Sequence, residues 1–539
     1  MKMLTEHFDF PELNFVTIVI TGATIIGIIF LRYLDYPTKV DVPVVGIGVR
    51  YTKWLAAVIN VRHARESIRE GYAKYGDFAF QIPTMTRMDV FICDRQMTRE
   101  YQNVDDHHLS FRAVMTEEFQ FKWLLPGQAH EARIIPNSVI AKALSWQRTR
   151  ANKPSDPFFE AFSAEFIQGF QEEVRRLIQY QNSSVMSNRP GAVLDPAHGW
   201  HAVPCFPLAL KVIGRLTTYV LFGKPLCRDA TFLNMCCQFG DVIPRDAIIL
   251  RSWPALARPL IVKVLSAPRL VGKLRNILII EIKSRRESHE TNPMSDILDF
   301  TMAWVDRHPN AGFDDQHIAE MMINTIFAAL HTSSQLVVHT IFELASRPEY
   351  SDALRKEMDA CFEKHGKGTK AALDSMYKVD SFIKETQRFN PLDACITALA
   401  RLALKDFTFS NGLNIPKGSV IFTPNSPIFE DERYYKDPKV FDGFRFARMR
   451  NDLKSGTFCD LTATNEQSMH FGTGRHACPG RFMVSDEVKL AVIHILSNFD
   501  FCIENFGPRP ANQPFGKFLL PDMSAKIWLR EKRARKKNL

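Results

Sequence analysis

The sequence predicts a mainly α-helical domain with a minor β-sheet, an α+β fold, preceded by a single N-terminal transmembrane helix. Stretches that mix apolar and charged residues at helical spacing dominate the chain, among them 158–180 and 271–290. Two short segments near the start of the domain, 76–83 and 89–94, have the composition of strands. An uncharged apolar run, 13–31, lies close to the N-terminus and has about the length needed to cross a bilayer as a helix.

The composition indicates one large globular domain, which we place at 51–529. Of the 539 residues, 46% are hydrophobic and 24% are charged, and no Gly/Ser linker, low-complexity tract or internal repeat divides the chain. The net charge of +9 is modest, and neither aromatic–basic alternation nor zinc-finger spacing occurs, which argues against nucleic-acid binding. Ten cysteines at irregular spacing, without a CxxC pair, indicate neither a disulfide framework nor a zinc ribbon.

The run 13–31 follows a short segment, 1–12, and we interpret it as an uncleaved anchor. A cleavable signal peptide is the alternative, but the segment 1–12 is net acidic and no clear small-x-small cleavage site follows. Basic residues outnumber acidic ones in the linker 32–50, which by the positive-inside rule places the domain in the cytosol. The basic tail 530–539 ends in a sequence similar to a dilysine endoplasmic-reticulum retrieval signal. This tail is either simply solvated or attracted to anionic lipid or an acidic partner.

Two later segments are apolar and have a simple structural explanation. The segment 248–271 is rich in Leu, Ile and Pro with basic residues among them, so it is either ordinary core packing or a lipid-contacting surface that admits a greasy substrate. The segment 314–346 predicts one long helix with an almost uncharged middle, AALHTS at 328–333. Core packing alone would account for that middle.

A glycine-rich loop, FGTGRHACPG at 471–480, directly precedes a predicted helix over 481–499. Its glycines allow the backbone to bend tightly around Cys478, and Gly480 leaves room for a flat cofactor to approach. A thiolate at a helix N-terminus is favoured by the unpaired backbone N–H groups and by the helix dipole. A buried cysteine in a glycine-rich turn is the simpler interpretation of this segment by itself.

Together these segments resemble the cytochrome P-450 superfamily, in the form found in filamentous-fungal members of secondary metabolism. The heme-binding signature of the family, FxxGxRxCxG, is matched at Phe471, Gly474, Cys478 and Gly480. Where the signature has arginine this chain has His476, with Arg475 one place earlier. The resemblance implies the cytochrome P-450 fold, with Cys478 as the axial ligand of the iron of heme b. Either His476 or Arg475 would then contact a heme propionate.

Two further motifs of the family follow the expected order along the chain. Glu385 and Arg388 match the ExxR helix, although such a pair by itself indicates only a surface contact within a helix. The segment 441–446 supplies Arg445, which in the family joins the ExxR pair in a buried structural triad behind the heme.

Further candidates for binding the heme propionates lie elsewhere in the chain. Arg401 falls where many members place a propionate-binding arginine, but it could equally be an ordinary strand residue. Trp146 and Arg150 have the spacing of the family's WxxxR pair, whereas the neighbouring segment 130–133 could align better with the corresponding helix.

The helix over 314–346 matches the family motif AGx(D/E)T(T/S). In the family, the small residues of this motif leave space over the iron, and its acid and alcohol deliver protons to bound oxygen. Ala328 and Ala329 fit the space and Thr332 fits the alcohol, whereas His331 replaces the acid. A histidine titrates near neutrality, so His331 either relays protons or is a passive helix residue.

The resemblance implies a heme-thiolate monooxygenase that oxidises a lipophilic small molecule, such as a terpenoid of secondary metabolism, at the endoplasmic-reticulum membrane. No GxGxxG motif follows a predicted strand, so electrons would come from an NADPH-dependent cytochrome reductase in the same membrane.

Three different functions could use part of the same sequence. A heme-thiolate isomerase, dehydratase or desaturase would carry nearly the same motifs. A non-catalytic heme sensor would need the cysteine loop but neither the small residues at 328–329 nor a substrate channel. A zinc site built from His470, His476 and Cys478 would lack an evident fourth ligand at the usual spacing.

Overall fold

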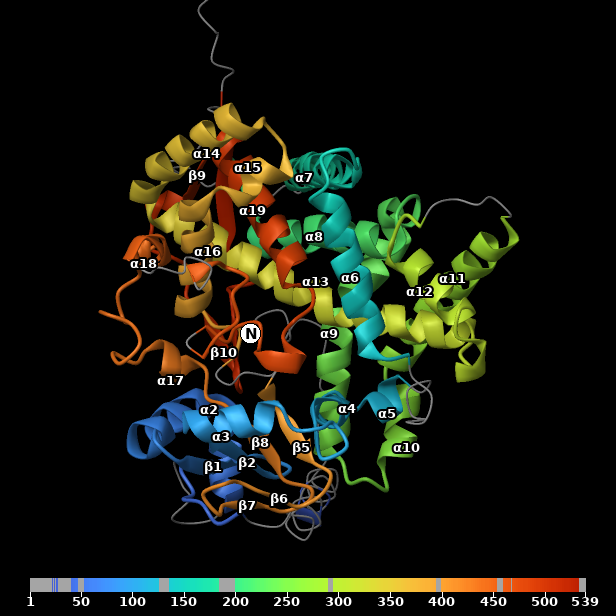
Figure 1. The fold of residues 1–539 in the computed structure, drawn as a ribbon, viewed down its shortest axis with the longest axis vertical. Coiled ribbons are helices and arrows are strands. Elements are labelled where there is room, and N and C mark those ends of the chain that lie inside the picture. Colours follow the sequence, from blue (N-terminus) through green and yellow to red (C-terminus); the bar gives the residue numbers. More distant parts are fainter. Residues whose placement is uncertain are drawn as a thin grey trace, which may run out of the picture.

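The computed structural model describes residues 40–46, 53–125, 135–183, 199–288, 294–393, 399–452, 459–466 and 468–532, together with residues 22, 24, 26 and 27. The described chain is mostly helical with small sheets, as the sequence predicts (Figure 1). Of the predicted anchor 13–31, only those four single residues are described, and they are helical. The prediction of a transmembrane helix therefore lies outside the described residues.

A five-stranded sheet with the order β1-β2-β8-β5-β3 lies at one end of the molecule, below the helices in Figure 1. Its strands are β1 (Ala79–Pro83), β2 (Met88–Ile92), β3 (Leu109–Ser110), β5 (Arg401–Ala403) and β8 (Val420–Phe422). Strands β2 and β8 pair in parallel and the other neighbours are antiparallel. The two strands expected at 76–83 and 89–94 thus form the hairpin β1–β2, and every residue of both is buried.

Part of the predicted linker 32–50 belongs to the folded body. Val44 forms a bridge with Gln81 of β1, and the Gln81 side-chain amide donates to the carbonyl oxygens of Val40 and Val42 at 2.9 and 2.8 Å. Because these backbone groups are buried against the sheet, residues 40–46 are an extension of it rather than a free connector.

The other sheets are smaller. They comprise β4 (His201–Pro204), β12 (Lys526–Glu531) and β9 (Phe499–Ile503) in one sheet, β6 (Phe407–Thr408) with β7 (Asn414–Ile415), and β10 (Gln513–Phe515) with β11 (Phe518–Leu520). Strand β12 extends to Glu531, and Arg530 forms a 2.9 Å ion pair with Asp500 of β9. The first two residues assigned to the tail 530–539 are therefore part of a sheet, and 533–539 lie outside the described residues.

The helices cover these sheets and pack on one another. They are α2 (Lys53–Tyr75), α3 (Arg95–Gln102), α4 (Phe111–Glu118), α5 (Phe121–Leu124), α6 (Asn137–Ala151), α7 (Phe158–Ser183), α8 (Cys205–Phe222), α9 (Ala230–Ser252), α10 (Arg258–Ile261), α11 (Ala267–Glu287), α12 (Ile297–Asp306), α13 (Asp315–Ser346), α14 (Ser351–His365), α15 (Lys370–Asp374), α16 (Tyr377–Phe389), α17 (Ser426–Phe429), α18 (Arg445–Asp452) and α19 (Arg481–Asn498).

Helix α13 is the central element of the helical body. Asp314 caps its N-terminus by accepting from the backbone N–H of His317, and the helix packs against α8, α9, α11, α16 and α19. Among the described residues, α8 and α13 are long and apolar enough to cross a membrane, but 78% and 61% of their apolar windows are buried inside the protein. Such burial is typical of core helices.

Candidate active site

The cysteine loop is closed by its own backbone. Cys478 N–H donates to the carbonyl oxygen of Phe471 at 2.7 Å, and the loop contains a short 3₁₀ turn, η10 (Gly474–His476), just before α19. Gly472 and Gly474 have φ angles of 68° and 62°, in the left-handed region that side chains rarely adopt. The backbone path that presents Cys478 thus requires glycine at 472 and 474, whereas Gly480 has a φ of −81°, which any residue can adopt.

Cys478 differs from the other cysteines in its surroundings. Of the cysteines that the structure describes, it alone is not buried. Partial burial raises the pKa of the Cys478 thiol, whereas the backbone N–H groups of Gly480 and Arg481 and the charge of Arg481 favour the thiolate and oppose that rise. A sulfur at this helix N-terminus is therefore accessible and ready to bind a cation, which would deprotonate it.

The middle of α13 presents an open face. Ala328 and Thr332, one turn apart, are exposed although most of the residues that follow them in α13 are buried. The Thr332 hydroxyl donates to the carbonyl oxygen of Ala328 at 3.0 Å, so it keeps its oxygen lone pairs for another partner. We call Ala328 and Thr332 the open face of α13. This helix packs directly against α19, which begins just after Cys478.

His331 is directed toward α9. Its Nε2 lies 3.3 Å from Oδ1 of Asp241, and its ring centroid lies 6.5 Å from that of Phe206 in α8. The structure therefore places His331 at the junction of α8, α9 and α13, directly before Thr332 in the chain.

Arg401 and His476, two of the proposed propionate ligands, lie near each other in space. Arg401 of β5 is fully buried, and its Cζ lies 5.9 Å from the ring centroid of Phe111, which in turn lies 6.2 Å from the ring of His476. Burial, followed by the charge of Arg401, lowers the pKa of His476, whose Nε2 lies 3.4 Å from Asp106. Arg475, in contrast, is exposed.

Arg150, the arginine of the WxxxR spacing, binds Asp156 and is not placed beside Arg401 and His476. Arg150 Nε donates to Asp156 at 2.8 Å, while 130–133 lie outside the described residues. Sequence reasoning missed Arg148, whose guanidinium lies 3.4 Å from the ring centroid of Phe482 in the first turn of α19. Only the fold shows this contact, because no motif relates α6 to α19.

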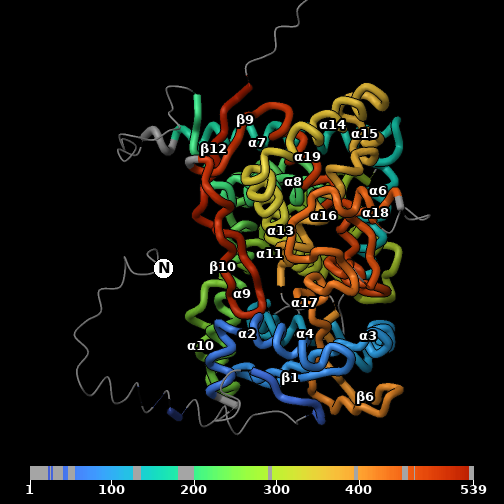
Figure 2. The backbone as a smooth tube through the Cα atoms, turned by 90° about the vertical axis from the view of Figure 1, so that its left-hand side faces the viewer, coloured from blue at the N-terminus to red at the C-terminus, as the bar shows by residue number. Residues whose placement is uncertain are grey.

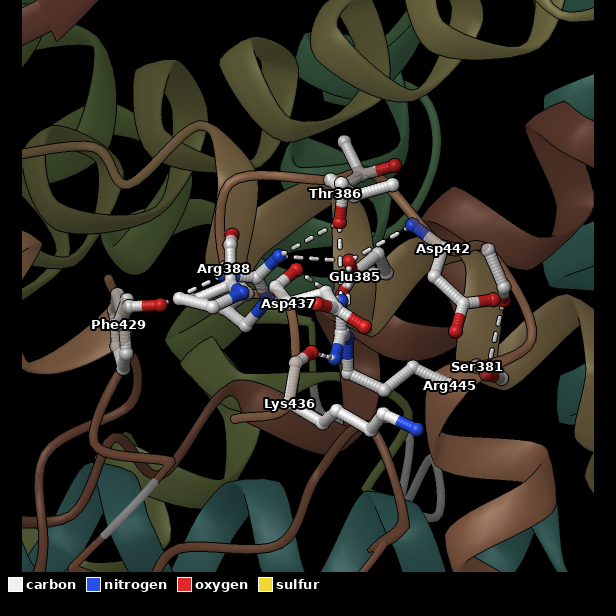
Figure 3. Close-up of polar contacts among 12 residues, drawn as sticks. Ser381, Glu385, Thr386, Arg388, Phe429, Lys436, Asp437, Asp442 and Arg445 are labelled. Atoms are coloured by element: carbon white, nitrogen blue, oxygen red, sulfur yellow. Dashed lines mark hydrogen bonds and ion pairs between the residues drawn. The ribbon is translucent and has the colours of Figure 1, made fainter. Parts of the chain in front are cut away.

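Glu385, Arg388 and Arg445 meet in the interior, as Figure 3 shows. Arg388 donates from Nε and Nη2 to the two carboxylate oxygens of Glu385, each at 2.8 Å, and Arg445 Nε lies 3.2 Å from both oxygens. The Asp442 N–H completes the set at 3.0 Å from Glu385. The remaining guanidinium N–H groups donate to carbonyl oxygens of Phe429, Lys436, Asp437, Pro438 and Val440. These contacts fix the chain that leads to α18.

The geometry gives no support to a zinc site. The His470 ring is stacked on Phe429 with 4.0 Å between centroids, and burial holds the pKa of His470 well below its usual value. Within the described part of the chain, no group of three or more His, Cys, Asp or Glu side chains is placed to hold a metal ion. His470 is therefore not placed to share a metal ion with Cys478.

Comparison with known proteins gives the family. The family model "Cytochrome P450" matches residues 53–529. The chain is 94% identical to cytochrome P450 monooxygenase ltmQ of Epichloe festucae var. lolii over the whole of both chains. It is 62% identical to terQ of Tolypocladium album, over 96% of this chain and 93% of that protein, and 39% identical to paxQ of Penicillium paxilli, over 92% and 93%.

A solved structure shows the same fold. Retinoic acid bound cyanobacterial CYP120A1 superposes with a TM-score of 0.65 at 16% identity, over 92% of this chain and 100% of that one. The resemblance seen in the motifs is therefore confirmed, and the family and fold imply a heme-iron cofactor. The family match and the high identity to named monooxygenases lead to one conclusion: the chain belongs to the cytochrome P450 family and is a monooxygenase.

Proposed function

We propose that Cys478 ligates the iron of heme b and that the open face of α13 borders the reacting part of a lipophilic substrate. The observation that carries this proposal is the contrast between Cys478 and the other described cysteines, which are all buried. When bound, a heme ligated by a thiolate supplies the activation of O2.

The residues present fit a heme. Cys478 offers one sulfur at the start of α19, and the open face of α13 leaves room beside a helix that packs on α19. Buried Arg401 and the adjacent His476 would hold the propionates, whereas Arg475 is exposed. We therefore expect His476→Ala to speed heme loss to apomyoglobin severalfold and Arg475→Ala to leave it unchanged. Equal rates for the two variants would contradict this assignment.

On the open face, the chain contributes a proton donor and open space. The Thr332 hydroxyl can pass on a proton: its oxygen accepts one proton while its own O–H proton moves into the open space. Ala328, without a polar side chain, leaves the position of the substrate unobstructed. This division of roles gives Thr332 a catalytic function and Ala328 a spatial one.

The surroundings of the open face favour an apolar substrate. Phe327, the neighbour of Ala328, contacts the rings of Phe119, Phe121 and Phe239 at centroid distances of 4.9, 5.7 and 5.8 Å. These aromatic rings suit a secondary metabolite such as a terpenoid, and the similarity to fungal monooxygenases supports this class.

Exposed apolar side chains support contact with a membrane. Leu256, Leu260 and Val264, between α9 and α11, are 94%, 68% and 73% exposed, and Val61 of α2 is 48% exposed. Figure 1 and Figure 2 both show α10 and α2 at the lower side of the molecule. With the run 13–31 as the anchor, this side would face the endoplasmic-reticulum membrane, and an NADPH-dependent cytochrome reductase would dock on the Cys478 side.

The carbon-monoxide difference spectrum of reduced membranes that contain the chain tests the proposal. A red-shifted Soret band is expected, because a thiolate then holds the heme iron. Absence of the band in heme-loaded, undenatured protein would overturn the assignment of Cys478. Product formation that requires both O2 and reductant is also expected, and product formed without either would indicate an isomerase or dehydratase instead.

A further inference from the structure

His331 is fitted to the backbone of α9 at Gly240. A Cβ atom added to Gly240 would lie 2.0 Å from both Cε1 and Nδ1 of His331, far inside contact distance. The imidazole therefore occupies the place that any other residue at 240 would fill. Glycine at 240 is thus what leaves this space to the ring.

Asp241, the next residue of α9, connects this imidazole with solvent. The Asp241 side chain is 63% exposed and that of His331 is 13% exposed, and their Oδ1 and Nε2 atoms are 3.3 Å apart. Neither ring nitrogen makes a hydrogen bond to the described residues. The exposed Asp241 carboxylate thus brings the imidazole within reach of a proton from solvent.

Among the described residues, a second acid close to this part of α13, Glu487, lacks access to solvent. Glu487 of α19 is fully buried, and one of its oxygens lies 3.5 Å from the hydroxyl of Thr217. A carboxyl group sealed in this way has no direct contact with bulk water. Of the two acids, only Asp241 joins solvent to α13.

We propose that Asp241 is a positioning residue that holds His331 for proton transfer from solvent to the open face of α13. This inference rests on the proposed monooxygenase site. A proton from bulk water at Asp241 binds Nε2 of His331 and gives an imidazolium paired with the carboxylate. The imidazolium then releases a proton toward the Thr332 hydroxyl, or toward a water beside it, and returns to neutral imidazole. No electrons move in this step, and each proton delivered is replaced from solvent.

The test uses the full-length chain in membrane vesicles with an NADPH-dependent cytochrome reductase. The rate of NADPH-driven O2 consumption is measured in H2O and in D2O, per amount of protein with the thiolate carbon-monoxide spectrum. Asp241→Asn should lower the rate about tenfold and enlarge the solvent isotope effect, because water replaces the relay less efficiently. Asp241→Glu should restore most of the rate, because it restores the carboxylate.

Gly240→Ala provides an independent variant, since it displaces the imidazole without removing it. We expect the same loss of rate and the same larger isotope effect as in Asp241→Asn, with an unchanged carbon-monoxide spectrum. Glu287→Gln, which removes an exposed charge at the end of α11, is the matched control and should behave as the wild type. Wild-type rates and isotope effects in both Asp241→Asn and Gly240→Ala, or no recovery in Asp241→Glu, would overturn the inference. Loss of the thiolate spectrum in the wild-type chain would instead refute the proposed site itself.

Discussion

The two sides of the candidate site differ in how completely their polar groups are bonded. Behind the cysteine loop, both oxygens of Glu385 are held by Arg388 and Arg445, and every one of these side chains is buried. On the open face of α13, Thr332 is exposed and its hydroxyl bonds only to its own helix. The Glu385 network holds the backbone in place, whereas the Thr332 hydroxyl keeps its oxygen lone pairs available for another partner.

The difference has a physical cause. A buried charge is stable only when its partners are in place, so the Glu385 network tolerates no missing member. An exposed hydroxyl contributes little to stability, so Thr332 can serve chemistry without affecting the fold. Substitutions on the first side should therefore remove the holoprotein, and those on the second should change only the outcome of turnover.

The largest effect is expected at the cysteine loop itself. Cys478→Ala should abolish the thiolate-ligated heme spectrum, because no other described cysteine is accessible. The measurement is the reduced carbon-monoxide difference spectrum, with Cys361→Ala, a buried cysteine of α14, as the control that keeps the band. An unchanged spectrum in Cys478→Ala would show that another group ligates the iron.

Arg388→Ala should disrupt the buried network around Glu385, because it removes the bonds from Arg388 to both carboxylate oxygens. The change leaves Glu385 buried with one partner fewer, which costs about 3–5 kcal/mol of folding free energy. We expect little heme per protein and a strongly lowered Tm. Lys74→Ala, which removes an exposed ion pair with Glu70, should change neither quantity. Full heme loading of Arg388→Ala would argue against the structural triad.

Glu487, a buried carboxyl of α19, makes the stability of the protein depend on pH. Burial raises the pKa of Glu487 to about 8 from an ordinary value of 4.5. Between about pH 4.5 and 8, Glu487 therefore keeps its proton in the folded protein, whereas the same side chain has lost it in the unfolded chain. This contribution to stability is complete below about pH 4.5 and is lost as the pH rises through about 8.

In the wild type, Tm should therefore decline between these two pH values, and Glu487→Gln should remove most of that decline. The corresponding change in the free energy of unfolding is about a few kcal/mol. Thermal unfolding across the pH range measures the effect, and Glu504→Gln, on the surface, should leave the wild-type slope unchanged. Parallel curves for wild type and Glu487→Gln would show that this carboxyl is not protonated in the folded state.

The smallest effect on folding is expected at the open face. Thr332→Ala should leave the carbon-monoxide spectrum intact and change the free energy of unfolding by about 0.5 kcal/mol or less. It should raise severalfold the share of NADPH electrons that appears as hydrogen peroxide, since the hydroxyl no longer delivers protons. Ser346→Ala, at the end of α13, is the control. A normal peroxide share in Thr332→Ala would remove Thr332 from the mechanism.

Local patterns were enough for much of the fold. The helix expected over 314–346 is found at Asp315–Ser346 with Asp314 as its cap, and the two strands near the start form β1 and β2. The packing of residues 40–46 on Gln81 was not predictable, because a Pro-containing segment without periodicity shows no partner.

By itself, the sequence determined the family, the enzyme class and the residue types of the candidate site, because glycine-rich turns, helix periodicity and motif order are local properties of the chain. Only the tertiary structure decided that His476 rather than Arg475 lies beside Arg401, that Arg150 binds Asp156, and that His331 rests on Gly240 and Asp241. These contacts join side chains of different elements or distant turns. Their choice depends on burial and packing, which one-dimensional spacing does not contain.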